Sequence, residues 1–330
     1  MKLLRKAGKW MAGLYRAYRH TGGFHHEEKM LVQRHYSTSH PQKGIRKQTV
    51  IAMADGRILH GGLSDRIRGM VSVYGYCKAH DIPFRLHYVS PFQLTDYLVP
   101  ASYDWRISQE EISYHPEEAV PILLTCDRLP NKHHLRYLKQ ILKKHPNRQI
   151  HLYTNTQFAD KDFQKNFSEL FRPVPALQER IEQAIAPGQG DFISMTFRFQ
   201  QLLGDFKEEG CKTLPPAEQE TLISRCIGKV KEIHDQRHPN QRILATSDSI
   251  TFLERLQQEL PYVFTIPGEV VHIDYTPEAS YETYLKPFLD QFALSKAKKV
   301  YLLRTGEMYR SGFGKRAAKM SGIPFEDIAF

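Results

Sequence analysis

Arg198 is the first residue whose position suggests chemistry. It follows the mostly apolar run FISMTF at residues 192–197, which reads as a buried strand. A guanidinium at the carboxyl end of such a strand can bind a phosphate through two parallel hydrogen bonds. It can equally pair with a structural carboxylate. The position alone leaves both interpretations open.

Asp248 stands in a similar place one strand later. The run RILATSDS at 242–249 passes directly into the helix-like ITFLERLQQEL. This is the pattern of a capped strand-to-helix turn. The same kind of turn holds a base or ribose in Rossmann-type sheets, where a carboxylate accepts from a ribose hydroxyl or a guanine N–H edge. Asp248 is therefore either a plain cap or a nucleotide contact.

A third polar turn carries Ser311, Gly312 and Phe313. It follows the strand-like run at 299–304 and opens a short helix. A hydroxyl and free N–H groups at a helix start favour an anion. The letters GFGK are not a phosphate-binding P-loop, because the required earlier glycine is missing and Arg316 follows Lys315.

The glycine pair Gly61-Gly62 lies in HGGLSDRIRG, between the apolar run TVIAMADGRIL and a helical stretch. One interpretation is an ordinary turn whose helix is capped by Ser64 or Asp65. The other is a loop whose backbone comes close to a phosphate. A cap explains part of the pattern but does not explain two adjacent glycines.

No metal site is predicted. Asp160-Lys161-Asp162 is formally the DxD pair of one glycosyltransferase fold, but it lies on a polar helical stretch, not at the end of an apolar strand. The sixteen histidines show no paired ligand spacing, and the four cysteines form no CxxC pair. Reduced thiols and the absence of a signal peptide or an uninterrupted apolar span favour a cytoplasmic protein.

These residues need a scaffold of alternating strands and helices. Helical stretches are expected at 64–80, 216–236, 249–259 and 278–295. Strands are expected at 48–54, 84–89, 120–126, 149–154, 192–197, 242–247 and 299–304. The alternation predicts an α/β protein with parallel sheets covered by helices. A Pro- and Gly-rich break at 186–191 divides it into domains 48–188 and 189–330, facing each other across a ligand cleft.

The net charge of +10 is concentrated at the start of the chain. Residues 1–54 hold eleven Lys or Arg and two Glu, which leaves +1 for the rest of the chain. A nearly neutral body argues against a nucleic-acid partner. Residues 1–47 form a basic leader, and 1–20 have the spacing of an amphipathic helix. That helix either lies on an anionic membrane, peripherally at its inner face, or docks on the protein body.

Taken together, GGLSDRIRG, FISMTFRF, LATSD and the run PFLDQFALSKAKKVYLLRTGEMYRSGFGKRAA resemble the fucosyltransferase superfamily of GT-B fold. This superfamily includes the nodulation-type, core α1,6-type and protein O-fucosyltransferases. The resemblance spans about residues 48–322 and is strongest over 192–322. It implies two facing Rossmann-like domains, with the acceptor side first and the donor nucleotide in the second. It also implies inverting, metal-independent transfer of fucose from GDP-fucose to a glycan hydroxyl, as in polysaccharide biosynthesis.

The resemblance assigns roles to single residues. Thr196 stands where the family has His, and Arg198 matches the Arg that binds the donor diphosphate. Asp248 matches a carboxylate of the nucleotide-edge motif. The remaining donor contacts implied are the turn Ser311, Gly312 and Phe313 and the first-domain glycines Gly61 and Gly62. Asp205, or a neighbouring Glu208 or Glu209, is the general-base candidate.

Two alternatives remain open, and a third is disfavoured. In the first, the donor is a nucleotide sugar other than GDP-fucose. In the second, the chain is a non-catalytic relative that binds a nucleotide or glycan. A sulfotransferase is disfavoured, because its phosphate-binding loop would need a lysine that HGGLSDRIRG lacks. The basic leader fits a lipid-linked oligosaccharide acceptor. Acceptor contacts are expected between residues 84 and 185, with Tyr88, Tyr103, Asp104 and Trp105 as candidates.

Overall fold

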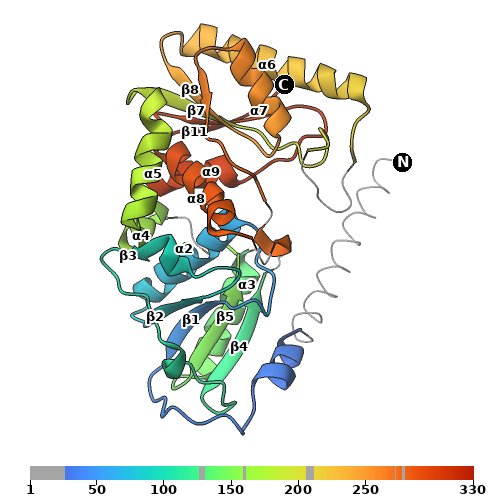
Figure 1. Ribbon diagram of the computed structural model, residues 1–330. Coiled ribbons are helices and arrows are strands. Elements are labelled where there is room, and N and C mark those ends of the chain that lie inside the picture. Colours follow the sequence, from blue (N-terminus) through green and yellow to red (C-terminus); the bar gives the residue numbers. More distant parts are fainter. Residues whose placement is uncertain (1–26, 126–130, 159–160, 206–211, 272, 277–278) are drawn as a thin grey trace. The chain divides into compact units, whose positions relative to one another are not determined.

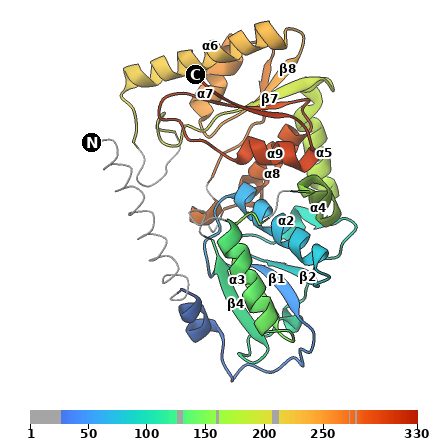
Figure 2. The same cartoon turned by 180° about the vertical axis from the view of Figure 1, so that it is seen from behind.

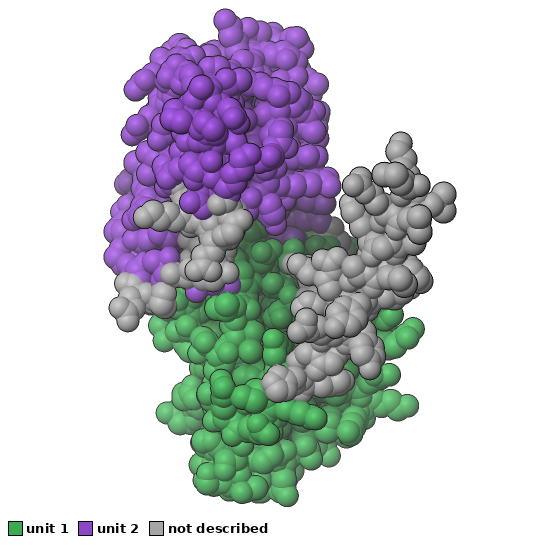
Figure 3. All heavy atoms as spheres, turned by 90° about the vertical axis from the view of Figure 1, so that its right-hand side faces the viewer, with its two compact units in different colours: residues 1–94, 100–171 green, residues 95–99, 172–330 purple. Residues whose placement is uncertain are grey.

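Two parallel β-sheets, each with its own helices, organise the chain in the computed structural model, which describes residues 27–125, 131–158, 161–205, 212–271, 273–276 and 279–330 (Figure 1). Unit 1 comprises residues 1–94 and 100–171, and unit 2 comprises 95–99 and 172–330. Figure 3 shows the atoms that belong to each. The predicted α/β class with parallel sheets is confirmed, and each unit is described below by itself.

Unit 1 is built on a four-stranded parallel sheet of order β2-β1-β5-β4. Its strands are β1 (Thr49–Ala54), β2 (Phe84–Tyr88), β4 (Ala119–Leu124) and β5 (Gln149–Thr154). All of β5 and nearly all of β1 and β4 are buried, as expected for a parallel sheet covered on both faces. The main helices are α2 (Leu63–Ala79), α3 (Asn131–Lys144) and α4 (Phe163–Leu170).

The two faces of this sheet are covered differently. The crossovers β1-α2-β2 and β4-α3-β5 move in the same direction along the sheet, so right-handed connections place α2 and α3 on one face. Both helices lie in front of the sheet in Figure 2. The other face carries a core cluster in which Leu31, Ile51, Leu123 and Tyr153 pack together. Leu31 belongs to a helical segment at residues 27–35, which therefore covers that face.

Residues 27–47 are part of unit 1 and pack onto its sheet and onto the segment before β4. Glu28 is buried and accepts a hydrogen bond from the N–H of Leu123 at 2.9 Å. Glu118 accepts backbone N–H groups of residues 43–45 at 2.7–3.1 Å. The part of the predicted basic leader before residue 27, including the expected amphipathic helix, lies outside the described residues. Among the described residues, no helix is both long and apolar enough to cross a membrane.

Unit 2 is built on a five-stranded parallel sheet of order β11-β10-β7-β8-β9. Its strands are β7 (Phe192–Thr196), β8 (Arg242–Thr246), β9 (Val263–Thr265), β10 (Val300–Arg304) and β11 (Phe325–Ala329). Alternate strand residues such as Ile193, Met195 and Tyr301 pack with α6 (Pro216–Arg237) and α7 (Ile250–Glu259) in one core cluster. The opposite face carries α8 (Tyr281–Ser295) and α9 (Phe313–Ser321), as both ribbon views show.

The helices of unit 2 begin and end where local sequence favours it. Pro216 opens α6 at a position where its missing N–H costs nothing. Ser249 caps α7 by accepting from the N–H of Phe252, and Ser280 caps α8 in the same way. Helix α9 ends at Gly322, whose φ of 68° suits glycine.

The segment that joins the two sheets contains α5 (Pro175–Ile185), which packs against α8 and belongs to unit 2. The short strands β3 (Leu98–Pro100) and β6 (Phe171–Pro173) pair with each other where the chain passes between the units. The unit boundary by contacts thus precedes α5, whereas the sequence break at 186–191 follows it.

Candidate functional site

Three of the residues predicted to bind the donor follow neighbouring strands of unit 2. Arg198 comes after β7, Asp248 after β8 and Ser311 after β10, and these strands are adjacent and parallel. Their carboxyl ends therefore share one edge of the sheet, which is where open α/β sheets bind ligands. The structure thus brings together residues that are 113 positions apart in sequence (198 to 311).

Arg198 and Asp248 form an ion pair at this edge. Nη1 of Arg198 lies 3.2 Å from Oδ2 of Asp248, and the Asp248 side chain is 1% exposed while that of Arg198 is 19% exposed. The carboxylate also accepts the N–H groups of Phe199 at 2.8 Å and Gln200 at 2.6 Å. Asp248 therefore fixes the backbone that follows Arg198 as well as its guanidinium.

Donors from the protein itself surround both oxygens of the Asp248 carboxylate. The hydroxyl of Ser247 donates to Oδ1 at 3.4 Å, so each carboxylate oxygen has two donors. Burial raises the pKa of Asp248, whereas Arg198 and the two backbone donors act to lower it. The predicted contact with the nucleotide edge stays a prediction. In the geometry described, Asp248 acts on Arg198 and its loop.

The turn before α9 is tied to the same edge. The N–H of Tyr309 donates to the carbonyl of Arg198 at 3.0 Å, which joins the loop after β10 to the loop after β7. The hydroxyl of Ser311 accepts the N–H of Phe313 at 3.2 Å, and Gly312 is the N-cap of α9. From α8, Gln291 donates to the carbonyl of Phe313 at 3.0 Å. The start of α9 is thereby held at the sheet edge with its N-terminal dipole directed outward.

Thr196 and Gly314 explain how closely α9 approaches the sheet. The hydroxyl of Thr196 donates to the carbonyl of Tyr301 at 3.2 Å, and the residue is 3% exposed. A Cβ added to Gly314 would lie 2.9 Å from Cγ2 and Oγ1 of Thr196 and 3.1 Å from Val300. Only glycine allows this contact. Thr196 is thus a packing residue beneath the turn, and a donor contact through its hydroxyl stays a prediction.

Asp205, the predicted base candidate, lies at the start of α7. Its Oδ2 accepts the hydroxyl of Ser249 at 2.8 Å and the N–H of Thr251 at 2.9 Å, and the residue is exposed. These contacts support the cap of α7. The alternative candidates Glu208 and Glu209 lie outside the described residues.

The glycine pair Gly61-Gly62 belongs to unit 1 and stands before α2. Gly61 has a φ of +82°, and its carbonyl accepts Nε of Arg66 at 3.0 Å. Gly62 is the N-cap of α2 with an ordinary φ of −69°, so neither Ser64 nor Asp65 is the N-cap residue; Asp65 lies in the first turn of the helix. A Cβ at Gly62 would meet nothing within 4 Å. The fold thus requires glycine at 61 but not at 62.

Three of the four acceptor candidates serve the core of unit 1. Nε1 of Trp105 donates to the carbonyl of Leu170 at 2.7 Å, and the Tyr103 hydroxyl bonds both backbone groups of Phe84. Tyr88 is 4% exposed. Asp104 is exposed and pairs with Arg106 at 2.8 Å.

Two cavities of unit 1, one lined by residues such as Val120 and Tyr137 and the other by residues such as Met30 and Arg57, contain none of the predicted donor residues. In the described part of the chain, no group of three or more His, Cys, Asp or Glu side chains is placed to hold a metal ion. Of the formal DxD pair, Asp162 precedes α4 and is exposed, and Asp160 lies outside the described residues.

Two supporting residues were not found from the sequence. Gln291 lies in the middle of α8, where its spacing resembles that of the surrounding apolar core positions. Tyr309 acts through its backbone, which leaves no side-chain signal. For Gly314 a signal did exist, because a glycine inside the first turn of a helix is unfavourable unless close packing requires it.

No protein-family model matches this sequence, and no curated protein sequence matches it. Solved structures do match. The NodZ alpha-1,6-fucosyltransferase soaked with GDP-fucose is 11% identical, with a TM-score of 0.55, over 83% of this chain and 93% of that chain. The NodZ fucosyltransferase from Bradyrhizobium has the same identity and TM-score over 82% and 92%.

A mutant of Arabidopsis thaliana FUT1 in complex with GDP is 14% identical, with a TM-score of 0.54, over 91% of this chain and 74% of that chain. At these identities the likeness concerns the fold, and it extends over most of both chains. The resemblance predicted from the motifs is therefore confirmed at the level of structure: this chain has the GT-B fold of the NodZ and FUT1 fucosyltransferases.

Proposed function

We propose that this protein is an inverting, metal-independent glycosyltransferase that moves fucose from GDP-fucose to a hydroxyl of a glycan acceptor. The observation that carries the proposal is the convergence of Arg198, its partner Asp248 and the Ser311–Phe313 turn at the carboxyl edge of the unit 2 sheet. The fold supports the proposal, because NodZ has been solved soaked with GDP-fucose and FUT1 in complex with GDP.

The chemistry at this edge suits a departing diphosphate. When an acceptor hydroxyl attacks the sugar carbon and GDP leaves from the opposite face, negative charge develops on the β-phosphate. Arg198, the Ser311 hydroxyl and the N-terminal N–H groups of α9 offer positive charge and donors there. Because the ion pair and the turn are already held by Asp248 and Gln291, little reorganisation is needed when the charge forms.

Gly61 and Gly62 are proposed as the contribution of unit 1 to diphosphate binding. The support is local: Gly62 has an ordinary φ and open space around its Cα, so apart from its position as the N-cap of α2 nothing in unit 1 calls for glycine there. Close approach of a ligand to the backbone is such a reason.

The functional test is transfer of labelled sugar to an array of glycan acceptors, including lipid-linked oligosaccharides, with GDP-fucose compared with UDP- and ADP-sugars. We expect transfer from GDP-fucose alone, a product of inverted anomeric configuration, and an unchanged rate after chelation of divalent ions. Transfer from a different nucleotide sugar would identify a GT-B enzyme with another donor. Nucleotide binding without transfer or donor hydrolysis would identify a non-catalytic relative.

Asp205 is proposed as the general base that takes the acceptor proton. Because its Oδ2 also supports the α7 cap, the two roles need separate variants. Asp205→Asn keeps an oxygen for Ser249 and Thr251 but removes the basicity. We expect it to retain the wild-type unfolding midpoint and to lose the acidic limb of the pH–rate profile. An unaltered profile would remove Asp205 from the mechanism.

A further inference from the structure

Unit 1 carries a surface whose charge the proposed transfer does not use. Helix α3 contains no Asp or Glu, and its residues Arg136, Lys139, Lys143 and Lys144 are all exposed. Among the described residues, none of these four cations forms an ion pair. Arg136, Lys139 and Lys143 follow the i, i+3, i+7 spacing and so share one side of the helix. Leu138 and Leu142 are buried on the other side, against the body of unit 1.

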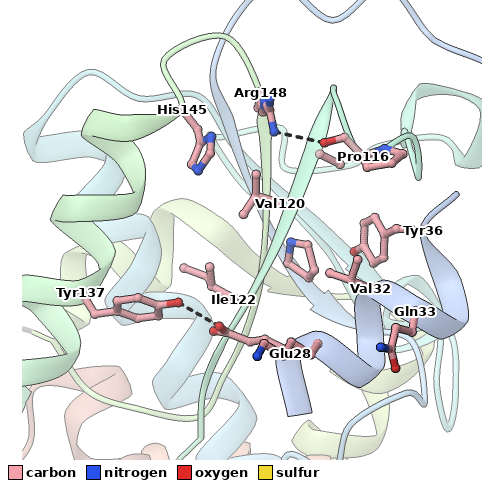
Figure 4. Close-up of a pocket in the computed structure, with 13 residues that line it drawn as sticks. Glu28, Val32, Gln33, Tyr36, Pro116, Val120, Ile122, Tyr137, His145 and Arg148 are labelled. Atoms are coloured by element: carbon pink, nitrogen blue, oxygen red, sulfur yellow. Dashed lines mark hydrogen bonds between the residues drawn. The ribbon is translucent and has the colours of Figure 1, made fainter. Parts of the chain in front are cut away.

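A cavity of about 860 Å³ adjoins this helix. It runs beside β4, between α3 and the helical residues 27–35, and its floor includes Val120 and Ile122 (Figure 4). Val32, which is 38% exposed, and Tyr137 of α3 add further apolar wall. The volume and the largely apolar lining match sites that hold a flexible apolar ligand.

The charged groups of the cavity lining are two cations, Lys29 and Arg148, and one carboxylate. Lys29 has no ion pair among the described residues, and Arg148 uses one guanidinium N–H to bind the carbonyl of Pro116 at 3.0 Å. The only carboxylate in the lining is Glu28, which accepts from Leu123 and from the Tyr137 hydroxyl at 2.8 Å. The pKa of His145 is lowered by burial and by the charges of Arg148 and Lys144, so this lining residue does not add a positive charge at neutral pH.

The free edge of β4 borders this cavity, but it offers little to an added strand. The outward N–H groups belong to alternate residues, namely 119, 121 and 123. Ala119 donates to the carbonyl of His115, Pro121 has no N–H, and Leu123 donates to Glu28. An extended peptide would therefore find no donor along this edge. The chemistry favours an apolar chain with an anionic head group instead.

We propose that the α3 face and the adjoining cavity form a docking site for an anionic lipid bilayer, with lipid head groups on the α3 cations and apolar lipid groups in the cavity. The proposal differs from membrane binding by residues 1–20, because it depends on residues of unit 1 that are folded into its helices and sheet. An apolar cavity beside the cations favours a lipid over a nucleic acid, which presents no apolar chain. The proposal also stands independently of the sugar that the protein transfers.

The test uses the full chain and sedimentation with vesicles of phosphatidylcholine, with or without phosphatidylglycerol. We expect binding to the anionic vesicles alone, weakening as salt is added. The variant K139Q/K143Q/K144Q is expected to bind about a hundredfold more weakly, since each cation near an anionic surface is worth roughly fivefold. The variant V120T, which changes no charge, is expected to bind the vesicles about fivefold more weakly, because it places a hydroxyl in the apolar lining of the cavity.

Matched variants separate docking from general charge and from misfolding. K231Q/K296Q/K298Q removes the same charge from exposed positions of unit 2 and is expected to bind like wild type. K139R/K143R/K144R keeps the charge and is expected to do the same. Wild-type binding by K139Q/K143Q/K144Q, with an unchanged unfolding midpoint, would overturn the proposal and leave residues 1–26 as the anchor. Binding of duplex DNA in place of vesicles would overturn it as well.

Discussion

Asp248 holds Arg198 from two sides: its carboxylate lies 3.2 Å from the guanidinium and also accepts the N–H groups of the next two residues. This relationship combines the two interpretations that the sequence left open for Arg198. The arginine is paired with a structural carboxylate, and it stands at the sheet edge where a phosphate would bind. A buried partner of this kind keeps an arginine in one geometry without neutralising all of its donors.

Asp248→Asn tests this arrangement. The amide offers one acceptor oxygen where the carboxylate offered two, so the two donors of one oxygen lose their acceptor: either Gln200 N–H and the guanidinium, or Phe199 N–H and the Ser247 hydroxyl. We expect the free energy of unfolding to fall by about 1–3 kcal/mol. Because Arg198 is then less well positioned, GDP affinity should fall as well. Chemical denaturation and calorimetry measure the two effects. Asp191→Asn, at an exposed position, is the matched control and should change neither.

Gly62→Ala separates ligand approach from folding. The ordinary φ and the open space around Gly62 predict no backbone strain or clash, so stability should fall only by the few tenths to about 1 kcal/mol that alanine costs at an N-cap. If the backbone there contacts the diphosphate, the added methyl group should weaken GDP binding severalfold. Gly61→Ala is the contrasting variant, because its φ of +82° predicts a loss of about 1 kcal/mol in stability. Full GDP affinity in Gly62→Ala would exclude this glycine from the donor site.

Gly314→Ala tests the close packing of α9 on the sheet. The new Cβ would lie 2.9 Å from Thr196, so we expect a loss of about 1–3 kcal/mol in the free energy of unfolding. Adding Thr196→Ala should recover part of it. Gly228→Ala, inside α6 with nothing within 4 Å, is the matched control and should gain up to about 1 kcal/mol. Equal effects at the two helical glycines would contradict the packing argument.

His151 predicts how unit 1 responds to acid. The Oε1 atom of Gln149 is an acceptor, since it also accepts the N–H of Ser113. Nε2 of His151, 3.1 Å from this oxygen, therefore carries the proton and donates to it. Nδ1 is then unprotonated and accepts the Tyr36 hydroxyl at 2.7 Å. Burial lowers the pKa of this neutral histidine to about 3. Between that value and the ordinary 6.5 the unfolded chain binds the extra proton, so stability is complete above pH 6.5 and falls as the pH drops.

The slope that His151 contributes is up to about 1.4 kcal/mol per pH unit. Denaturation at a series of pH values should therefore show a flatter dependence between pH 6.5 and 4 for His151→Gln than for wild type. Curves that run parallel over this interval would show that the histidine is not the group that titrates.

Most strands of both sheets could be predicted because a strand that is buried on both faces consists mainly of apolar residues. The seven predicted strands correspond to β1, β2, β4, β5, β7, β8 and β10 within two residues at each end. Strand β11 was missed because Glu326 and Asp327 interrupt its pattern; both acids are paired across the sheet edge, with Lys299 and Arg304 among their partners. Helix α3 was missed because only one narrow stripe of it faces the core, and the rest is basic.

The candidate site was predictable only in part. The positions of Arg198, Asp248 and Ser311 after strands were visible, since strand ends follow from local pattern. Their mutual contacts were not, because the strand order β10-β7-β8 is a long-range property. Similarly, the sequence gives no sign of the backbone hydrogen bond from the Tyr309 N–H to the Arg198 carbonyl. Nor does it indicate that the Gln291 side chain donates to the carbonyl of Phe313.

Calorimetric titration of the full chain with GDP tests the central claim most directly, with UDP as the comparison nucleotide and Arg198→Ala as the variant. The account predicts that GDP binds and UDP binds far more weakly. It also predicts that Arg198→Ala loses most of the GDP affinity, because the diphosphate loses its principal cation. The unfolding midpoint of this variant should fall but leave it folded, because the buried Asp248 carboxylate loses its cation and keeps its backbone donors. Wild-type GDP affinity in a folded Arg198→Ala variant, or no GDP binding by the wild-type chain, would contradict the account.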